Sequence, residues 1–320
     1  TSLRVYYFGL AGLSPARVNS FVSILSSGLV QPADSLDVWF ELKPNQRTLF
    51  RGAPFRTNMQ GLADDEYTHE KPANTYRVAV IESSWTMGSA VAIEDVFHSV
   101  LEKDFNQESD SIQYEFINFG VELYGLGEMM GTVNDKALRY NPDMIMFVVT
   151  GFTPNIRWVT HESPFVPPPE KKSRWKSYVL LRLAGFLGIR DDESNVVTEL
   201  RSVGRPNEYG LYSRQMKRAF SQLSAISAAK RIPVAAVWLR LNEQDATNNR
   251  LTKIFLGQAE KSNLVGAVVN LEDYLKPGEP VHKILVNRSE KHPNEYGHKM
   301  IAAELREKLF PDGPPTISAP

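Results

Sequence analysis

Polar residues that could carry out acyl transfer follow the apolar, strand-like runs of this sequence. Ser84 comes shortly after the run at residues 77–81, while Asn118 and Asn155 lie at or just beyond the ends of the next two runs. Near the C-terminus, His292 stands directly before the last segment with helical spacing. Acyl transfer needs a hydroxyl nucleophile, hydrogen-bond donors for an oxyanion and an imidazole base, and this set of residues offers all three.

The elements that would position these residues alternate between strand and helix from residue 77 onward. Short apolar, β-branched runs predict buried strands at residues 77–81, 114–118, 144–149, 234–239 and 266–270. Helical spacing predicts helices at residues 91–105, 128–140, 214–230, 251–262 and 296–309. This alternation predicts a three-layer α/β/α sandwich with a central, mostly parallel sheet. In such sheets ligands bind beyond the carboxyl ends of the strands, where the polar clusters fall.

The remaining segments suggest how the chain is organised. We expect an N-terminal extension packed on the core, an α/β domain and a frayed, proline-rich tail, at residues 1–73, 74–310 and 311–320. Within the extension, residues 14–29 favour a helix and residues 32–67 favour irregular structure. The proline-rich stretch 164–172 is a linker or lid candidate. Residues 175–189 would either cap the substrate cleft or cover one face of the sheet.

Composition excludes several classes of function. The 320 residues include 36 Lys and Arg against 37 Asp and Glu, so the basic surface that a nucleic-acid partner requires is not expected. The absence of cysteine rules out disulfides, cysteine-based zinc sites and thiol nucleophiles. Four other histidines are scattered without ligand spacing, so no metal is expected: His69, His98, His161 and His282. No apolar run reaches the ~20 residues that span a bilayer.

The compartment and the oligomeric state stay open at this point. The chain begins with Thr1 and shows no basic-then-apolar signal pattern, which suggests a mature form and is compatible with a signal or anchor that has been removed. A chain without cysteine is tolerated in any compartment. Bacterial periplasmic, secreted and cytoplasmic locations are therefore all retained.

Taken in order, the polar clusters resemble the motif blocks of the SGNH hydrolases, also called the GDSL esterase/lipase superfamily. Residues 77–91 resemble the family's first block, a strand followed by Gly-Asp-Ser-x-Thr-x-Gly. Residues 118–125 resemble the second block, Asn-x-Gly-Val-x-Gly-Tyr-Gly. The third block, Gly-x-Asn-Asp, is weakly matched at residues 153–156, whereas Asp-x-His-Pro-Asn-x-x-Gly-His is well matched at residues 290–298. The resemblance spans residues 77–309 and implies an SGNH-hydrolase-like fold and a serine esterase without a cofactor.

The resemblance also implies roles for individual residues. Ser84 would be the nucleophile and His292 the general base. The oxyanion would be bound by the backbone N–H groups of Ser84 and Leu123 and by the side chain of Asn155. Glu290 would be the acid that orients the histidine. An imidazole must take the serine proton and preorganised donors must meet the oxyanion, which is consistent with this set.

The sequence departs from the family pattern at four places. Glu82 and Ser83 replace Gly-Asp before the serine, and Leu123 replaces a glycine. Ile156 stands where the family has Asp. The acid before the histidine is Glu290 rather than Asp, and a Ser-His dyad helped by a backbone carbonyl is the alternative.

Each of these residues also has a structural interpretation. Ser84 could be a helix N-cap, a common position for serine. His292 could cap or pack, and His298, inside the last helix, is interpreted as structural. Trp85 and Tyr124 are candidate substrate contacts, although Trp85 could equally be a core residue. Asn155 could be a turn residue and Glu290 a solvated carboxylate.

The sequence therefore predicts a serine-dependent carboxylic ester hydrolase acting on a small-molecule or glycan-linked ester. Two alternatives are kept. The same residues could transfer an acyl group to a glycan or other alcohol if water is excluded from the acyl-enzyme. The departures from the family pattern would also suit a non-catalytic binding protein on the same fold.

Overall fold

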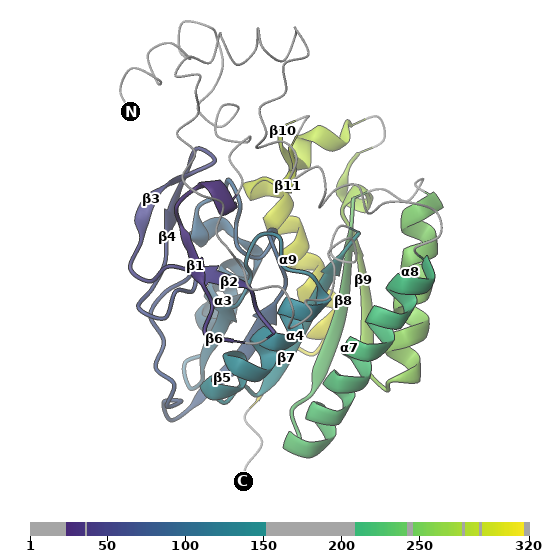
Figure 1. Cartoon of the computed structure of the whole chain (residues 1–320), viewed down its shortest axis with the longest axis horizontal. Coiled ribbons are helices and arrows are strands. Elements are labelled where there is room, and N and C mark those ends of the chain that lie inside the picture. The colour runs from purple at the N-terminus through teal and green to yellow at the C-terminus, as the bar shows by residue number, and fades with distance from the viewer. Residues whose placement is uncertain are drawn as a thin grey trace, which may run out of the picture.

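A five-stranded parallel sheet forms the centre of the molecule (Figure 1). The computed structural model describes residues 24–35, 37–151, 209–241, 246–276, 279–287 and 290–316. The strand order is β6-β5-β7-β8-β9. The strands are β5 (Thr75–Ile81), β6 (Gln113–Asn118), β7 (Met144–Thr150), β8 (Val234–Arg240) and β9 (Val265–Asn270). Each of the five apolar runs is a strand, so the prediction of an α/β fold around a parallel sheet is confirmed.

Helices cover both faces of this sheet (Figure 1). They are α3 (Phe97–Glu108), α4 (Leu126–Asp135), α7 (Tyr209–Lys230), α8 (Ala246–Lys261) and α9 (Glu295–Leu309). Alternate residues of a strand point to opposite faces. Val80 of β5 packs in one core cluster with residues of α3 and α9, whereas Ala79 and Ile81 pack in a second cluster with residues of α4, α7 and α8. The result is a three-layer sandwich.

Two predicted helices have different bounds in the structure. The helix expected from residue 91 begins only at Phe97, after a short 3-10 helix, η2 (Ile93–Asp95). The backbone is extended at Ala92 and Val96, with ψ values of 146° and 145°, so a continuous α-helix forms only after Val96. The helix expected over residues 128–140 is α4 followed by a 3-10 helix, η3 (Ala137–Tyr140).

The N-terminal part of the chain is more regular than predicted. Within the stretch expected to be irregular lie two antiparallel hairpins. They pair β1 (Val30–Pro32) with β2 (Phe40–Leu42), and β3 (Arg47–Phe50) with β4 (Ala53–Arg56). Only the end of the helix predicted over 14–29 is described, and residues 24–29 form a 3-10 helix, η1 (Ile24–Ser26), and a turn.

These hairpins share the hydrophobic core of the sheet. Phe40, Phe50 and Phe55 are buried in the same cluster as Ile81 of β5 and Met129 of α4. The division into an extension, a domain and a tail remains a prediction. The expected lid and cap segments lie outside the described residues.

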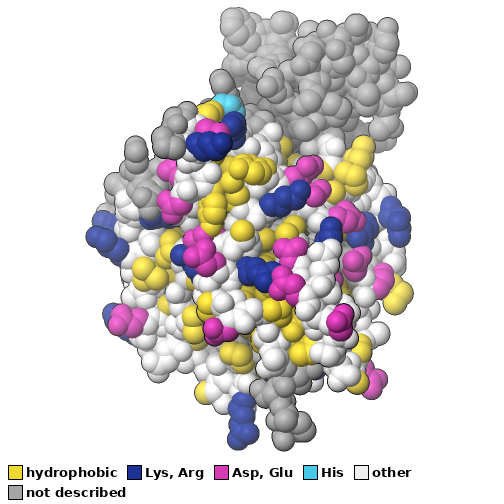
Figure 2. All heavy atoms as spheres, turned by 180° about the vertical axis from the view of Figure 1, so that it is seen from behind, with side chains coloured by type: hydrophobic (Ala, Val, Ile, Leu, Met, Phe, Trp, Pro, Cys, Tyr) yellow, Lys and Arg dark blue, Asp and Glu magenta, His cyan; other side chains and the backbone are white. Residues whose placement is uncertain are grey.

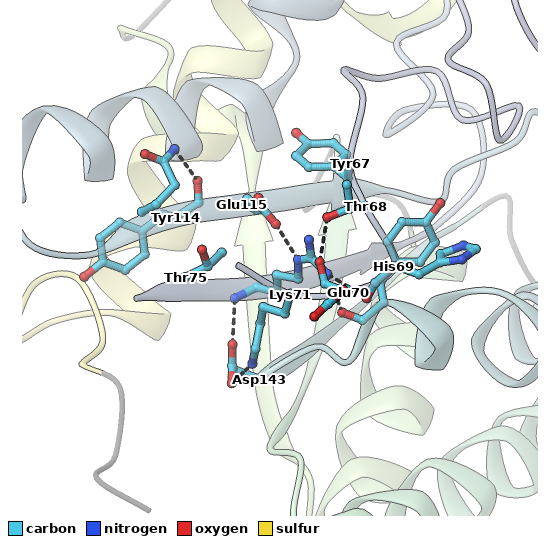
Figure 3. A network of polar contacts seen from close by, with 12 residues as sticks. Tyr67, Thr68, His69, Glu70, Lys71, Thr75, Tyr114, Glu115 and Asp143 are labelled. Atoms are coloured by element: carbon cyan, nitrogen blue, oxygen red, sulfur yellow. Dashed lines mark hydrogen bonds and ion pairs between the residues drawn. The ribbon is translucent and has the colours of Figure 1, made fainter. Parts of the chain in front are cut away.

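A buried polar network anchors the segment before β5 at the amino end of the sheet (Figure 3). Arg77 is fully buried, and its guanidinium pairs with Glu115 of β6 and donates to the carbonyl of Tyr140 over 2.8 Å. Asp143 accepts the backbone N–H of Arg77 over 2.8 Å and the ammonium of Lys71 over 2.6 Å. The chain is thus fixed at the end of the sheet opposite to the polar clusters.

The surface has mixed charge. On the face seen in Figure 2, basic and acidic side chains are interspersed with apolar ones rather than gathered by sign. In the parts of the chain that the structure describes, no helix combines the length and the apolar character needed to cross a bilayer.

Candidate active site

The topology of the sheet creates a switch point at the end of β5. From β5 the chain crosses to β6 on one side, and it then returns to β7 on the other side. All these strands are parallel, so their carboxyl ends meet at one edge. Crevices that bind ligands form at such switch points. Ser84 lies three residues beyond the end of β5, at this edge.

The turn after β5 is closed by its own hydrogen bonds. The carboxyl group of Glu82 accepts the backbone N–H of Thr86 over 2.7 Å and the hydroxyl of Ser83 over 2.8 Å. The carbonyl of Ser84 accepts the N–H of Ser89 over 3.2 Å. Residues 84–90 are turns, so Ser84 does not cap a helix and that interpretation is wrong. Ser84 is partly exposed, as an attacking hydroxyl must be.

Glu82 occupies the position of the family's glycine and is fully buried. Burial raises the pKa of the Glu82 carboxyl, while the hydrogen bonds from Thr86 and Ser83 and the nearby charge of His292 lower it. Ser83 and Thr86 both belong to the segment around Ser84, so the Glu82 carboxyl holds this turn closed.

The second block packs directly onto the first. Asn118 donates to the carbonyls of Thr86 over 2.7 Å and Ala63 over 3.0 Å, and its side-chain oxygen accepts the N–H of Gly120 over 2.8 Å. A Cβ at Gly120 would lie 2.8 Å from the carbonyl oxygen of Ser83. Asn118, the last residue of β6, therefore holds the first two polar clusters together through its hydrogen bonds.

Leu123 has a backbone conformation that suits glycine. Its φ is +75°, in the left-handed region that side chains with a Cβ disfavour. The resemblance implies a glycine at this position. Leu123 thus holds a left-handed conformation that strains a residue with a Cβ, and its partly buried side chain packs against the core.

His292 lies in a short strand rather than in a loop. It belongs to β11 (Glu290–Pro293), which pairs with β10 (Leu285–Asn287), and α9 follows. At the start of α9, the side chain of Asn294 accepts the N–H of Gly297 over 2.9 Å and caps the helix. His298 in α9 is buried and stacks on Phe97, as its structural interpretation predicted.

An arginine from the N-terminal part links His292 to the first two blocks. Arg51 donates from Nη1 to Nδ1 of His292 over 3.3 Å and from Nη2 to Glu122 over 2.6 Å. The other carboxylate oxygen of Glu122 accepts the hydroxyl of Ser89 over 3.1 Å. Sequence reasoning missed Arg51 and Glu122. The only local signal for this contact was the Arg51-Gly52 pair, which indicates a turn between two short segments of alternating polar and apolar residues.

The remaining predicted site residues divide into two groups. Asn155 and the side chain of Glu290 lie outside what the structure describes, so their roles stay predictions. Trp85 and Tyr124 are core residues, 3% and 2% exposed, and the hydroxyl of Tyr124 donates to the carbonyl of Phe40. Such buried side chains offer no surface to a substrate, which corrects their assignment as substrate contacts.

The arrangement holds ionisable groups without gathering metal ligands. Within the described residues, no three His, Asp or Glu side chains lie close enough together to hold a metal ion. The site edge instead combines one partly exposed hydroxyl, one imidazole, one guanidinium and two buried carboxyl groups.

A comparison with solved structures found chains of partial similarity, whereas no family model and no curated protein matches the sequence. An acetyl xylan esterase, AlAXEase, is 15% identical with a TM-score of 0.47, and the match covers 73% of this chain and 100% of that one. The lipase/acylhydrolase from Enterococcus faecalis is 10% identical with a TM-score of 0.46, over 76% and 100% of the two chains. The esterase EstA from Pseudoalteromonas sp. is 13% identical with a TM-score of 0.43, over 74% and 96%. The likeness concerns the chain path alone. The structure itself shows a parallel five-stranded sheet with the first two polar clusters at its carboxyl edge.

Proposed function

We propose that this protein is a serine-dependent carboxylic ester hydrolase in which Ser84 forms the acyl-enzyme and His292 is the general base. The observation that carries the proposal is the chain of contacts from Ser89 through Glu122 and Arg51 to His292. These contacts support the proposal because they link His292 to Ser89, which belongs to the same turn as Ser84, although more than two hundred positions separate Ser84 and His292 in the sequence.

The proposed reaction follows from the chemistry of these groups. His292 would take the proton of the Ser84 hydroxyl as it attacks the ester carbonyl, and would return it to the leaving alcohol. The backbone N–H groups of Ser84 and Leu123 and the side chain of Asn155 would stabilise the oxyanion. Water activated by His292 would then release the acyl group. The substrate would be a small-molecule or glycan-linked ester.

Turnover of p-nitrophenyl acetate and labelling by a fluorophosphonate test this proposal. The Ser84→Ala variant should lose both, with a fall in kcat of about 10³-fold or more, because a serine nucleophile has no substitute. Ser83→Ala is the matched control, since it removes the adjacent hydroxyl, which is buried and bonded to Glu82. Ser83→Ala should still be labelled by the fluorophosphonate at Ser84. Equal turnover by wild type and Ser84→Ala would refute the proposal.

One observation favours a non-catalytic binding protein as the second candidate. The guanidinium of Arg51 contacts Nδ1 of His292. In serine hydrolases an acid at this nitrogen keeps the ring in the reactive tautomer. A wild-type protein that binds acetylated sugars but neither turns over esters nor reacts with the fluorophosphonate would establish this alternative.

A further inference from the structure

Arg51 occupies a turn position that disfavours its own residue type. It forms, with Gly52, the two-residue connection between β3 and β4, with φ values of +50° and +90°. Positive φ at both positions is typical of a type I′ hairpin, which favours Asn-Gly or Asp-Gly. An arginine there costs free energy and persists only when its surroundings hold it. The tip of a hairpin is usually solvated, yet Arg51 is only 8% exposed.

The contacts of the side chain account for this burial. Its guanidinium is held by Glu122 over 2.6 Å, lies 5.3 Å from the centre of the Phe50 ring and reaches Nδ1 of His292 over 3.3 Å. Ser89 holds the second oxygen of Glu122, so the carboxylate is fixed in turn. The hairpin itself is anchored by Phe50 and Phe55, whose rings lie 5.6 Å apart in the core.

The chemistry of the two partners decides where the imidazole proton sits. A guanidinium has five N–H donors and no acceptor. The nitrogen that it contacts must therefore offer a lone pair, and in the neutral ring the proton is then on Nε2. A general base for serine needs the opposite arrangement, a lone pair on Nε2 and a proton on Nδ1.

We propose that Arg51 is a positioning residue that favours the Nε2–H tautomer of His292 and thereby lowers the reactivity of Ser84 while the guanidinium is at Nδ1. The catalytic consequence rests on the proposed esterase function, whereas the tautomer does not. Activity then depends on the position of the β3–β4 hairpin tip. Departure of Arg51 frees Nδ1 to take the proton and frees Nε2 to act as a base.

The tautomer of His292 can be measured in the wild-type protein without any activity. Long-range ¹H–¹⁵N correlation at pH 8 distinguishes the two tautomers of a neutral imidazole, and the ring signals that disappear in His292→Gln assign the residue. We expect the lone pair on Nδ1 and the proton on Nε2. A His292 that is mainly Nδ1–H in the wild type would overturn the proposal, whatever the variants do.

Three arginine variants test the origin of the tautomer. Arg51→Gln introduces an acceptor, so Nδ1–H should become populated and fluorophosphonate labelling of Ser84 should rise at least ~10-fold, since a wrong tautomer costs up to ~10⁴-fold in rate. Arg51→Lys keeps a donor-only group and should keep the wild-type tautomer. Arg56→Gln, in the same hairpin but paired with Asp65 and Glu94, is the matched control and should change nothing.

The outcomes separate the two proposals. An Arg51→Gln protein with the wild-type tautomer, or with slower labelling, would show that Arg51 is merely structural and would overturn the inference. Absence of labelling in every variant, together with the expected tautomer change, would support the role of Arg51 and refute the esterase function.

Discussion

The buried Arg51–Glu122 pair should be strongly coupled in stability. Its nitrogen and oxygen are 2.6 Å apart, and the two side chains are 8% and 5% exposed. At an effective dielectric constant of about 20, Coulomb's law gives an attraction of about 6 kcal/mol at this distance. Desolvation of the two ions offsets much of this attraction, so the net contribution of the pair is small. Removal of one partner, however, leaves the other charge buried and alone, which costs ~3–5 kcal/mol.

Urea unfolding of four proteins measures this coupling. They are the wild type, Arg51→Met, Glu122→Gln and the double variant. We expect each single change to lower the free energy of unfolding by ~3–5 kcal/mol. The double variant should lose much less than the sum, because it buries no unpaired charge, and the coupling energy should be at least about 2 kcal/mol.

A second arginine–glutamate pair in the same part of the chain is the control. Arg56 and Glu94 are 3.0 Å apart, but their side chains are 28% and 68% exposed. The same cycle with Arg56→Met and Glu94→Gln should give a coupling of only ~0.2–1 kcal/mol. Additive effects below ~1 kcal/mol for Arg51 and Glu122 would refute the reasoning that burial of this pair is what couples it.

Three further predictions concern other buried positions. Burial, together with the charge of Asp64, raises the pKa of Glu102 to about 8, so the folded state holds a proton that the unfolded state releases above its ordinary pKa. The free energy of unfolding should then fall as pH rises from about 5 to 8. Glu102→Gln should reduce this slope by up to ~1.4 kcal/mol per pH unit, as measured by urea unfolding at several pH values. An unchanged slope in the variant would contradict the raised pKa of Glu102. Gly120→Ala should destabilise the protein by ~1–3 kcal/mol or more in thermal unfolding and abolish fluorophosphonate labelling of Ser84, because its Cβ would lie 2.7–2.8 Å from backbone atoms of the adjacent turn. Gly257→Ala in α8, which has open space around it, should instead stabilise the protein by ~1 kcal/mol. Equal effects of the two changes would refute the packing argument. Leu123→Gly relieves the strain of a left-handed φ but removes a partly buried side chain. The free energy of unfolding measured in urea should therefore change by less than ~1 kcal/mol. A loss above ~2 kcal/mol would show that packing of the Leu123 side chain outweighs the strain.

The central sheet could be predicted from the sequence because its signals are local. Residues 78–81 and 144–149 are apolar on both faces, as strands covered by helices on both sides must be, and they lie in β5 and β7. The shared location of the polar clusters could also be predicted, because a parallel sheet brings the carboxyl ends of its strands to one edge. The strand order itself was settled only by the folded chain.

The hairpins could not be predicted because their strands are too short to show a period. β3 and β4 have four residues each, in a segment rich in proline, glycine and polar residues. Likewise, a strand of four residues that carries His292 resembles a loop in the sequence. The pairing of such segments depends on the core that they cover.

What the sequence alone determined is the five strands of the central sheet, the helices that cover it, and the candidate serine and histidine, because hydrophobic period and motif order are local properties of the chain. What only the tertiary structure decided is the charge and hydrogen bonding around these groups. Arg51 meets Glu122 and His292 from 71 and 241 positions away. The energy and the geometry of such contacts depend on how close the groups lie and how deeply they are buried in the folded protein. Neither property can be read from the residues that flank them in the sequence.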